Sequence, residues 1–352
     1  MIQNAVKKLT EHKDLSYNEV VECMREIMEG RADDLAISDF LLALKMKGES
    51  VDELKAMFDV MNEFSIKIRP IVNGRLIDTC GTGGDKIKTF NISTASAFIA
   101  SAAGVNVAKH GNRSMSGVCG SADALEYFGY NLNTEPEDVK RCIEELGIGF
   151  MFAPKFHPAM KNVANARKQL GVRTTFNILG PLSNPANVNA QIVGVSDPAL
   201  IDKVVTLLQR IGREEAMVFH ANDGLDELSN TCINQIAWLK NGTINKFVLN
   251  AKSFKIGIAE PADLSVMSKE ESVEQTFRVL NGTANEKRTG AVLLNAAASL
   301  IVANKADSFE DAIELSKKAM HGGGAYKKLK ALIKSCGDVS VLEGLEKRWQ
   351  NS

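Results

Sequence analysis

From about residue 71 onward, short apolar runs alternate with amphipathic stretches, and this alternation limits the possible folds more than any other feature of the sequence. The candidate strands are LIDTC, VNVAKH, IGFMFAP (148–154), AQIVGVS (190–196), AMVFHA (216–221) and FVLNA (247–251). Helical patterns such as PALIDKVVTLLQRIG lie between them. Strands separated by helices usually run parallel in one sheet, which the helices cover. The sequence therefore predicts a larger α/β domain over residues 71–352, with a central mainly parallel sheet.

The N-terminal part of the chain lacks this alternation and carries helix signals instead. Ser16 and Glu19 have the spacing of a capping box in front of an apolar stripe, and Ser50 and Glu53 repeat it. These signals predict a small all-helical domain over residues 1–70.

Two later stretches do not fit the alternation. The segment 155–185 begins as an amphipathic helix and ends as a loop with Gly and Pro, so we expect it to join the N-terminal helices. Gly322, Gly323 and Gly324 interrupt an otherwise helical C-terminal region, which predicts a hinge or a helix end.

Charge, cysteine content and hydropathy exclude several classes of protein. The chain has 42 Lys and Arg against 43 Asp and Glu, so it has no excess of positive charge with which to hold a nucleic acid. The six cysteines form no CxxC pair, which is typical of reduced thiols without zinc or disulfides. The longest apolar run, residues 291–303, is too short to span a bilayer. We therefore expect a cytoplasmic protein that binds neither nucleic acid nor membrane.

The first candidate site is the glycine-rich stretch Gly81–Asp85, which follows the strand LIDTC and precedes a helix. Glycines at such a junction let backbone N–H groups approach an anion, and the helix N-terminus adds partial positive charge. A glycine cluster alone is as often a tight turn. Here the same loop also carries polar groups that suit sugar hydroxyls, phosphate oxygens and a hard cation, namely Asp85, Thr89, Asn91, Ser93 and Thr94.

The second candidate site is residues 109–123, again between a strand (VNVA) and a helix (DALEYFG). Lys109 and Arg113 supply positive charge, while small residues keep the backbone accessible to an anion. Two such loops at neighbouring edges of one sheet predict a phosphate-binding site. Taken alone, His110 fits a structural or surface histidine, and Asp123 fits a cap in the first turn of a helix.

Two further features suit a site for a charged substrate. Asp226 and Glu227 follow the strand AMVFHA, and neighbouring carboxylates on a loop can bind magnesium, although such pairs also occur in solvated turns. Arg167 lies on a polar helical stretch and is either a surface charge or a planar fork for a substrate carboxylate. Together with the two loops, these residues indicate a magnesium-dependent enzyme that transfers the glycosyl group of a phosphorylated sugar.

In this order and spacing, these stretches resemble the anthranilate phosphoribosyltransferase family from the N-terminal helices to about residue 310. The motifs that carry the resemblance are GTGGD (81–85), FNIST (90–94), KHGNR (109–113), GSAD (120–123), HPAMKNVANARKQLGVRTTFNILGPLSNP (157–185) and GLDELS (224–229). The resemblance implies transfer of the phosphoribosyl group of PRPP to the amino nitrogen of anthranilate, with release of pyrophosphate, in tryptophan synthesis. It also implies a homodimer that associates through the helical domain, with the active site at the hinge between the domains.

The resemblance also implies a set of site residues. Its substrate-binding positions fall on Gly81, Gly84, Asp85, Thr89, Asn91, Ile92, Ser93, Thr94, Lys109, His110, Gly111, Asn112, Arg113, Ser116, Gly117, Ser121, His157, Arg167 and Gly180. Asn112 and Arg167 match positions that meet anthranilate, with Arg167 taking its carboxylate. The same channel is lined by His110, His157 and Gly180. The implied catalytic residues are Asp85, Lys109, Asn112 and Arg167. The implied magnesium positions are Ser93, Asp226 and Glu227, with two Mg²⁺ ions expected.

The chain departs from the family pattern after KHGNR. The family has a serine-rich run there, whereas this chain has Gly117 and Cys119. Backbone N–H groups then replace one or two hydroxyl contacts, which bears on PRPP affinity rather than on the type of reaction. An aryl amine is uncharged at neutral pH, so a strong general base is not required and none is assigned.

Two alternative functions stay open on the sequence. A pyrimidine nucleoside phosphorylase resembles this fold and also handles a ribosyl centre, but its expected Lys-His-Ser and Gly-Val-Gly-Asp signatures are absent. A non-catalytic paralogue that binds nucleic acid would keep the fold, but the near-neutral charge and the intact Asp226–Glu227 pair speak against it. The transferase is the function that we predict.

Overall fold

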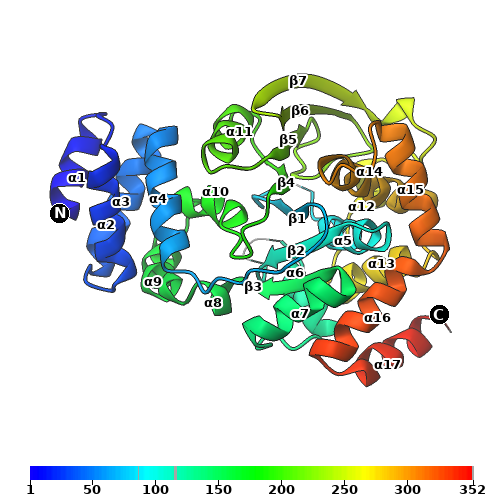
Figure 1. The fold of residues 1–352 in the computed structure, drawn as a ribbon. Coiled ribbons are helices and arrows are strands. Elements are labelled where there is room, and N and C mark those ends of the chain that lie inside the picture. Colours follow the sequence, from blue (N-terminus) through cyan, green and yellow to red (C-terminus); the bar gives the residue numbers. More distant parts are fainter. Residues whose placement is uncertain (86, 115–116, 351–352) are drawn as a thin grey trace.

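The computed structural model describes residues 1–85, 87–114 and 117–350, and it shows a helical bundle beside a sheet that helices cover (Figure 1). The bundle contains α1 (Ile2–Thr10), α2 (Tyr17–Met28), α3 (Asp34–Lys47) and α4 (Val51–Glu63). Both predicted capping boxes are present, Ser16 with Glu19 before α2 and Ser50 with Glu53 before α4. Apolar residues of all four helices share one buried core. The predicted helical N-terminal bundle is therefore confirmed.

Within the described residues, the strands form one seven-stranded sheet in the order β3-β2-β1-β4-β5-β6-β7. The strands are β1 (Leu76–Gly81), β2 (Asn106–Gly111), β3 (Ile148–Phe152), β4 (Ala190–Gly194), β5 (Glu215–Ala221), β6 (Ile233–Lys240) and β7 (Thr243–Asn250). Strands β3, β2, β1, β4 and β5 pair in parallel, whereas β6 and β7 are antiparallel to their neighbours. The predicted mainly parallel sheet is confirmed.

The hairpin of β6 and β7 differs from the predicted strands, which include none at β6 and only the last part of β7. The two strands are joined by Asn241 and Gly242, which both have positive φ angles (51° and 74°). An Asn-Gly pair with these angles is the preferred two-residue hairpin turn, so it was the signal for the missing strand. Strand β7 lies at the sheet edge and is largely exposed, which is why its apolar pattern is weak.

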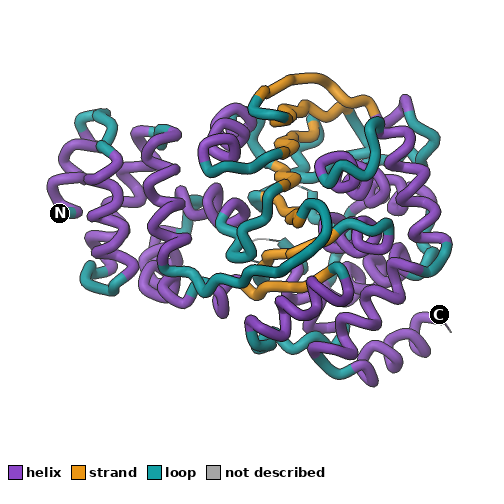
Figure 2. Tube along the Cα trace, viewed as in Figure 1, coloured by secondary structure: helices purple, strands orange, loops and turns teal. Residues whose placement is uncertain are grey.

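Helices lie on both faces of the twisted sheet, and a long loop leads from the bundle to β1 (Figure 2). The remaining α-helices are α5 (Ile92–Ala102), α6 (Ser121–Tyr127), α7 (Pro136–Leu146), α8 (Ala153–Phe156), α9 (Lys161–Leu170), α10 (Thr175–Leu182), α11 (Leu200–Arg210), α12 (Pro261–Leu264), α13 (Lys269–Leu280), α14 (Glu286–Val302), α15 (Phe309–His321), α16 (Gly324–Cys336) and α17 (Val339–Gln350). Alternate strand residues enter different cores: Ile77 and Ile192 pack with α5 and α14, whereas Val193 and Val218 pack with α11 and the bundle. This alternation is what a sheet covered on both faces requires.

The segment that did not fit the sheet pattern lies between the bundle and the sheet. Helix α9 packs against α2 and α3, and α10 packs against α4 (Figure 1). The Asn162 side-chain amide donates to the Met28 carbonyl (2.8 Å), and the Thr175 hydroxyl donates to the Glu49 carboxylate (2.7 Å). On the other side, the Gln191 side-chain amide of β4 donates to the Pro181 carbonyl of α10 (2.7 Å), so the segment contacts both the bundle and the sheet.

The glycine triplet near the C-terminus lies at a junction between two helices. Helix α15 ends at His321, α16 begins at Gly324, and Gly323 between them has a φ of +68°. Of the two readings proposed from the sequence, the triplet is thus a helix end. No helix in the described part of the chain is long and apolar enough to cross a bilayer.

Candidate active site

Two glycine-rich loops lie at the carboxyl ends of β1 and β2, which are neighbouring parallel strands. The first loop leads from Gly81 to α5, and the second leads from Gly111 to α6. Asn91 connects the two loops, because its side-chain amide donates to the Cys119 carbonyl (3.1 Å). The loops thus share one edge of the sheet, as the order of strands and helices predicted.

The acidic pair that follows β5 reaches into the first loop. Asp226 Oδ2 accepts from the Gly83 N–H (2.6 Å), and Glu227 Oε1 accepts from the Ser93 N–H (3.0 Å) in the first turn of α5. Both carboxylates are buried. The first loop, the start of α5 and the loop after β5 therefore form one polar cluster.

Two glycines allow the acidic pair to come this close. Gly81 and Gly194 are partners in the parallel register of β1 and β4. A Cβ at Gly81 would collide with the Asp226 carboxylate, and a Cβ at Gly194 would collide with the Asp226 backbone carbonyl. Gly81 is among the predicted site residues, whereas Gly194 is not. The available signal was a glycine inside a strand candidate, which often marks close approach of another backbone.

Burial and mutual repulsion shift the pKa values of these carboxylates upward. Burial, followed by the charge of Asp226, raises the pKa of Glu227 to about 8. The same two causes raise the pKa of Asp85 to about 7, while the positive charge of Arg173 opposes the shift. The groups that hold Asp226 and Glu227 in place are uncharged N–H donors. A bound cation would favour the ionised carboxylates and lower these pKa values again.

The donor set of this cluster suits Mg²⁺. Magnesium prefers oxygen ligands, and it usually takes one or two protein carboxylates and fills its other positions with water and substrate phosphate. Across residues 1–85, 87–114 and 117–350, no three His, Cys, Asp or Glu side chains converge as a metal-binding group. Asp226 and Glu227 therefore fit a magnesium site that a phosphorylated substrate helps to complete.

Lys109 is buried beside the first loop. Its Nζ donates to the Thr79 carbonyl (2.8 Å), and burial lowers its pKa while the charge of Asp78 opposes this. Asp78 in turn accepts from the His110 N–H (3.2 Å) and from the Asn184 amide (2.8 Å). Asp78 and Asn184 thus brace β1 against β2 beneath the loops, and neither is among the predicted site residues. A carboxylate inside an otherwise apolar strand was the one signal for this network.

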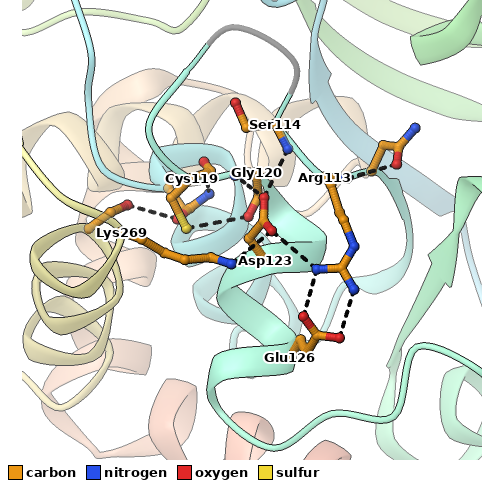
Figure 3. Close-up of polar contacts among 10 residues, drawn as sticks. Arg113, Ser114, Cys119, Gly120, Asp123, Glu126 and Lys269 are labelled. Atoms are coloured by element: carbon orange, nitrogen blue, oxygen red, sulfur yellow. Dashed lines mark hydrogen bonds and ion pairs between the residues drawn. The ribbon is translucent and has the colours of Figure 1, made fainter.

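Arg113 is held at the second loop by two carboxylates (Figure 3). Its guanidinium donates to both oxygens of Glu126 (2.6 and 2.7 Å) and pairs with Asp123 (3.3 Å). Asp123 also pairs with Lys269 of α13 (2.9 Å) and accepts from two backbone N–H groups of the loop (2.9 and 3.0 Å). Asp123 is therefore a cap at the start of α6, as one sequence reading had it, and Arg113 holds the loop against that helix.

The histidines of the predicted channel lie close together. The rings of His110 and His157 are 5.1 Å apart, and His157 Nε2 lies 2.9 Å from the Ser183 carbonyl. Burial lowers the pKa of His157 to about 4 and holds that of His110 well below its usual value, although the Gly180 backbone bonds to His110. His110 Nε2 is buried and has no hydrogen-bond partner among the described residues. Both rings are therefore neutral, and the Nε2 atom of His110 can form a hydrogen bond with a ligand.

Arg167 projects from α9, on the segment between the bundle and the sheet. Its guanidinium lies over the Phe176 ring, 5.5 Å from the ring centre, and burial lowers its pKa. A partly desolvated guanidinium that stacks on an aromatic ring is well suited to a planar carboxylate.

The other predicted residues lie on the two loops or at the helix starts that follow them. Ile92 and Thr94 are buried in the first turn of α5, and Thr94 Oγ1 has no partner within the part of the chain that the structure describes. Gly84 has a φ of +82°. Thr89 forms an isolated bridge with Ser265.

On the second loop, Gly111 packs directly against Ser121 at the start of α6, because a Cβ at Gly111 would collide with the Ser121 hydroxyl. Asn112 and Gly117 are exposed. Ser116 lies outside the described residues. The predicted residues thus gather on the two loops, the loop after β5, and the segment that carries α9 and α10.

Comparison with known families agrees with this arrangement. The description "Glycosyl transferase family, helical bundle domain" matches residues 3–65, and "Glycosyl transferase family, a/b domain" matches residues 73–326. The fold and the site therefore define a two-part glycosyltransferase.

Full-length relatives narrow this class. Anthranilate phosphoribosyltransferase of Nitrosopumilus maritimus (strain SCM1) is 45% identical over 343 residues, which cover 97% of this chain and 99% of the relative. The enzyme of the same name from Alkaliphilus metalliredigens (strain QYMF) is 44% identical and covers 97% and 100%. The chain belongs to the anthranilate phosphoribosyltransferase family.

Solved structures show the same fold. Anthranilate phosphoribosyltransferase from Thermus thermophilus superimposes with a TM-score of 0.88 at 37% identity, over 94% of this chain and 99% of that one. The Saccharomyces cerevisiae enzyme in complex with PRPP and Mg has a TM-score of 0.87 at 24% identity, over 95% and 97% of the chains. At that identity the likeness concerns the fold alone.

Proposed function

We propose that the chain transfers the phosphoribosyl group of PRPP to the amino nitrogen of anthranilate and releases pyrophosphate, as a step of tryptophan biosynthesis, with the site residues in the roles given below. The observation that carries the assignment of roles is the meeting of two glycine loops with the buried pair Asp226 and Glu227 at one edge of the sheet. Membership of the anthranilate phosphoribosyltransferase family favours the transferase over the two alternatives, the nucleoside phosphorylase and the non-catalytic paralogue.

The two loops and the start of α5 bind the phosphates of PRPP. Their backbone N–H groups and the helix N-terminus supply partial positive charge without filling the site with side chains. The Thr94 hydroxyl lies buried at that helix start, has no partner among the described residues, and offers a further hydrogen bond. Lys109 adds a positive charge close to the departing pyrophosphate.

Asp226, Glu227 and the Ser93 hydroxyl hold magnesium in this proposal, and we infer two ions per site. When bound, Mg²⁺ neutralises the charge that grows on pyrophosphate as the glycosidic bond breaks. The protein's part is to keep Asp226 and Glu227 oriented, which the N–H groups of Gly83 and Ser93 do.

Arg167 takes the carboxylate of anthranilate, and His110 and His157 line the acceptor channel. Neutral histidines suit this place, because a neutral ring offers both a donor and an acceptor and does not compete with Arg167 for the carboxylate. Asn112 is exposed at the start of the second loop, directly after β2, and contacts the acceptor in this proposal.

The reaction then depends mainly on positioning. The ribose carbon gains positive character as pyrophosphate leaves, and the uncharged aryl amine, oriented by its carboxylate, attacks that carbon. The amine loses its proton only as the new bond forms, so no strong base is needed.

The same proposal includes a homodimer and a cytoplasmic location. Helix α3 exposes Leu35, Leu42 and Met46, which are 71%, 40% and 73% accessible and lie at helical spacing on one face. An apolar stripe of this kind suits the partner bundle of a second copy.

The test follows the fluorescence of anthranilate mixed with purified protein, PRPP and Mg²⁺, and repeats it without each component. We expect the signal to fall only in the complete mixture. Asp226→Asn should slow the loss of fluorescence by at least roughly 100-fold, because it removes a charged ligand of the Mg²⁺ that would neutralise the leaving pyrophosphate. Asp307→Asn, the same change at an exposed residue, should leave the rate unchanged. A wild-type signal that stays constant in the complete mixture would refute the reaction, and an unimpaired Asp226→Asn enzyme would refute the metal assignment.

A further inference from the structure

Arg173 lies in the short connection between α9 and α10, and its guanidinium donates hydrogen bonds to the first glycine loop. Its Nη2 donates to the Thr82 carbonyl (3.0 Å), and its Nη1 donates to the Gly83 carbonyl. Nη1 also lies 3.2 Å from the Ser196 hydroxyl, just beyond β4. One guanidinium therefore joins the first loop to two other parts of the chain.

The loop needs such external support because its own backbone preference is weak. Gly83 and Gly84 are consecutive residues with positive φ angles of 68° and 82°. Glycine loses more conformational entropy than any other residue when it is ordered, so two in sequence make a loop that does not hold its shape by itself. The shape must come from contacts with neighbouring groups.

Arg173 and Asp226 hold the same residue from two sides. The Gly83 N–H donates to Asp226, while the Gly83 carbonyl accepts from Arg173. Gly84 packs against the guanidinium so closely that a Cβ there would collide with Nη1. The shape of the guanidinium matters, because its planar N–H groups can donate to two successive carbonyls at once. A lysine ammonium is instead a single point charge.

We propose that Arg173 is a positioning residue for PRPP: it fixes the two successive glycine peptides so that the Gly84 N–H faces the phosphates, while the Gly83 N–H holds Asp226. This inference rests on the proposed function, since it assigns the first loop to PRPP. It also connects the two halves of the site, because Arg173 follows Arg167 by six positions on the segment that carries the acceptor side.

The experiment compares Arg173→Gln and Arg173→Lys with Lys168→Gln, which neutralises an exposed cation on the same segment. Steady-state KM values are measured for PRPP and for anthranilate, each with the other substrate saturating. PRPP binding is also measured by calorimetry with Mg²⁺ and without anthranilate, so that no turnover occurs. Loss of hydrogen bonds from a charged donor typically weakens binding by roughly 10- to 100-fold.

We expect Arg173→Gln to raise the KM and the Kd for PRPP by that factor while the KM for anthranilate changes by less than roughly threefold, with Arg173→Lys in between. Lys168→Gln should match the wild type. Equal increases in both KM values, or a lower melting temperature with unchanged PRPP binding, would show a merely structural role and overturn the proposal. If Arg173→Gln does not fold, the KM and Kd values of Arg173→Lys test the proposal in the same way. A wild-type enzyme that fails to consume anthranilate would instead refute the proposed function.

Discussion

Replacement of Gly194 by alanine should disable the site through the backbone of Asp226. Gly194 ends β4, pairs with Gly81 of β1, and lies directly under the Asp226 carbonyl. The strand cannot move aside easily, because β4 is hydrogen-bonded to β1 on one side and to β5 on the other. The added methyl group must therefore displace the loop that carries Asp226 and Glu227.

The expected loss of activity can be worked out from the space between a Cβ at Gly194 and the Asp226 carbonyl oxygen. Real Cβ atoms essentially never approach another heavy atom closer than 3.0 Å, and the Asp226 carbonyl would have to retreat by more than about 1 Å to reach that distance. A misplacement of about 1 Å at a reacting centre costs roughly 100-fold in rate, or about 2.7 kcal/mol in transition-state stabilisation. We expect kcat/KM for PRPP to fall by at least this factor.

The assay is the loss of anthranilate fluorescence at several PRPP and Mg²⁺ concentrations, with thermal unfolding by circular dichroism measured in parallel. Gly344→Ala is the matched control, because Gly344 lies in α17 and a Cβ there meets no described atom within 4 Å. This control should keep full activity and gain slightly in stability, since alanine favours helix over glycine. If Gly194→Ala retained activity within roughly threefold of the wild type, the loop would accommodate the methyl group and the argument from clearance would be wrong.

Three other predictions use different parts of the molecule. Arg167→Ala should raise the KM for anthranilate by roughly 10- to 100-fold and leave the KM for PRPP nearly unchanged in steady-state assays, because it removes the charged donor for the carboxylate. The unfolding free energy, measured by urea titration, should fall as the pH drops from the ordinary histidine value of 6.5 toward about 4, because burial lowers the pKa of His157 and the unfolded chain binds the proton first. The share of His157 in that loss is about 3 kcal/mol at most, and His157→Gln should remove this share and leave the share of the buried His110, whose pKa is also lowered. Met46→Glu should convert a dimer of the 38.2 kDa chain to monomer in light scattering, since it places charge on the apolar face of α3.

Each of these has a result that would contradict it. Equal changes in both KM values would remove Arg167 from the carboxylate role. A pH dependence of stability that is the same in His157→Gln and in the wild type would show that other groups cause it. Met267→Glu places the same charge at an exposed methionine between α12 and α13, outside the bundle, and should not alter the mass. A monomeric wild type, or a dimer that persists in Met46→Glu, would exclude α3 as the interface.

Local signals in the sequence were sufficient for most of the fold. The capping boxes at Ser16 and Ser50 lead into helices because a side chain and a backbone N–H three residues apart satisfy each other whatever the rest of the chain does. The parallel strands were found because buried strands are apolar along their whole length. Strand β6 was missed because it alternates buried and exposed residues, and the first part of β7 was missed because this edge strand is largely exposed.

The sequence by itself determined the type of site, because glycine loops at strand ends and an acidic pair are local features. Only the tertiary structure decided how these parts support one another. Gly83 meets Asp226 across 143 positions, Arg173 meets Gly83 across 90, and Asn184 meets Asp78 across 106. Contacts at such separations depend on how every intervening element packs, and no local propensity encodes them. Shorter separations also depend on the fold: Arg113, which its sequence context made a candidate phosphate ligand, pairs with Glu126 and Asp123 because α6 packs beside the second loop.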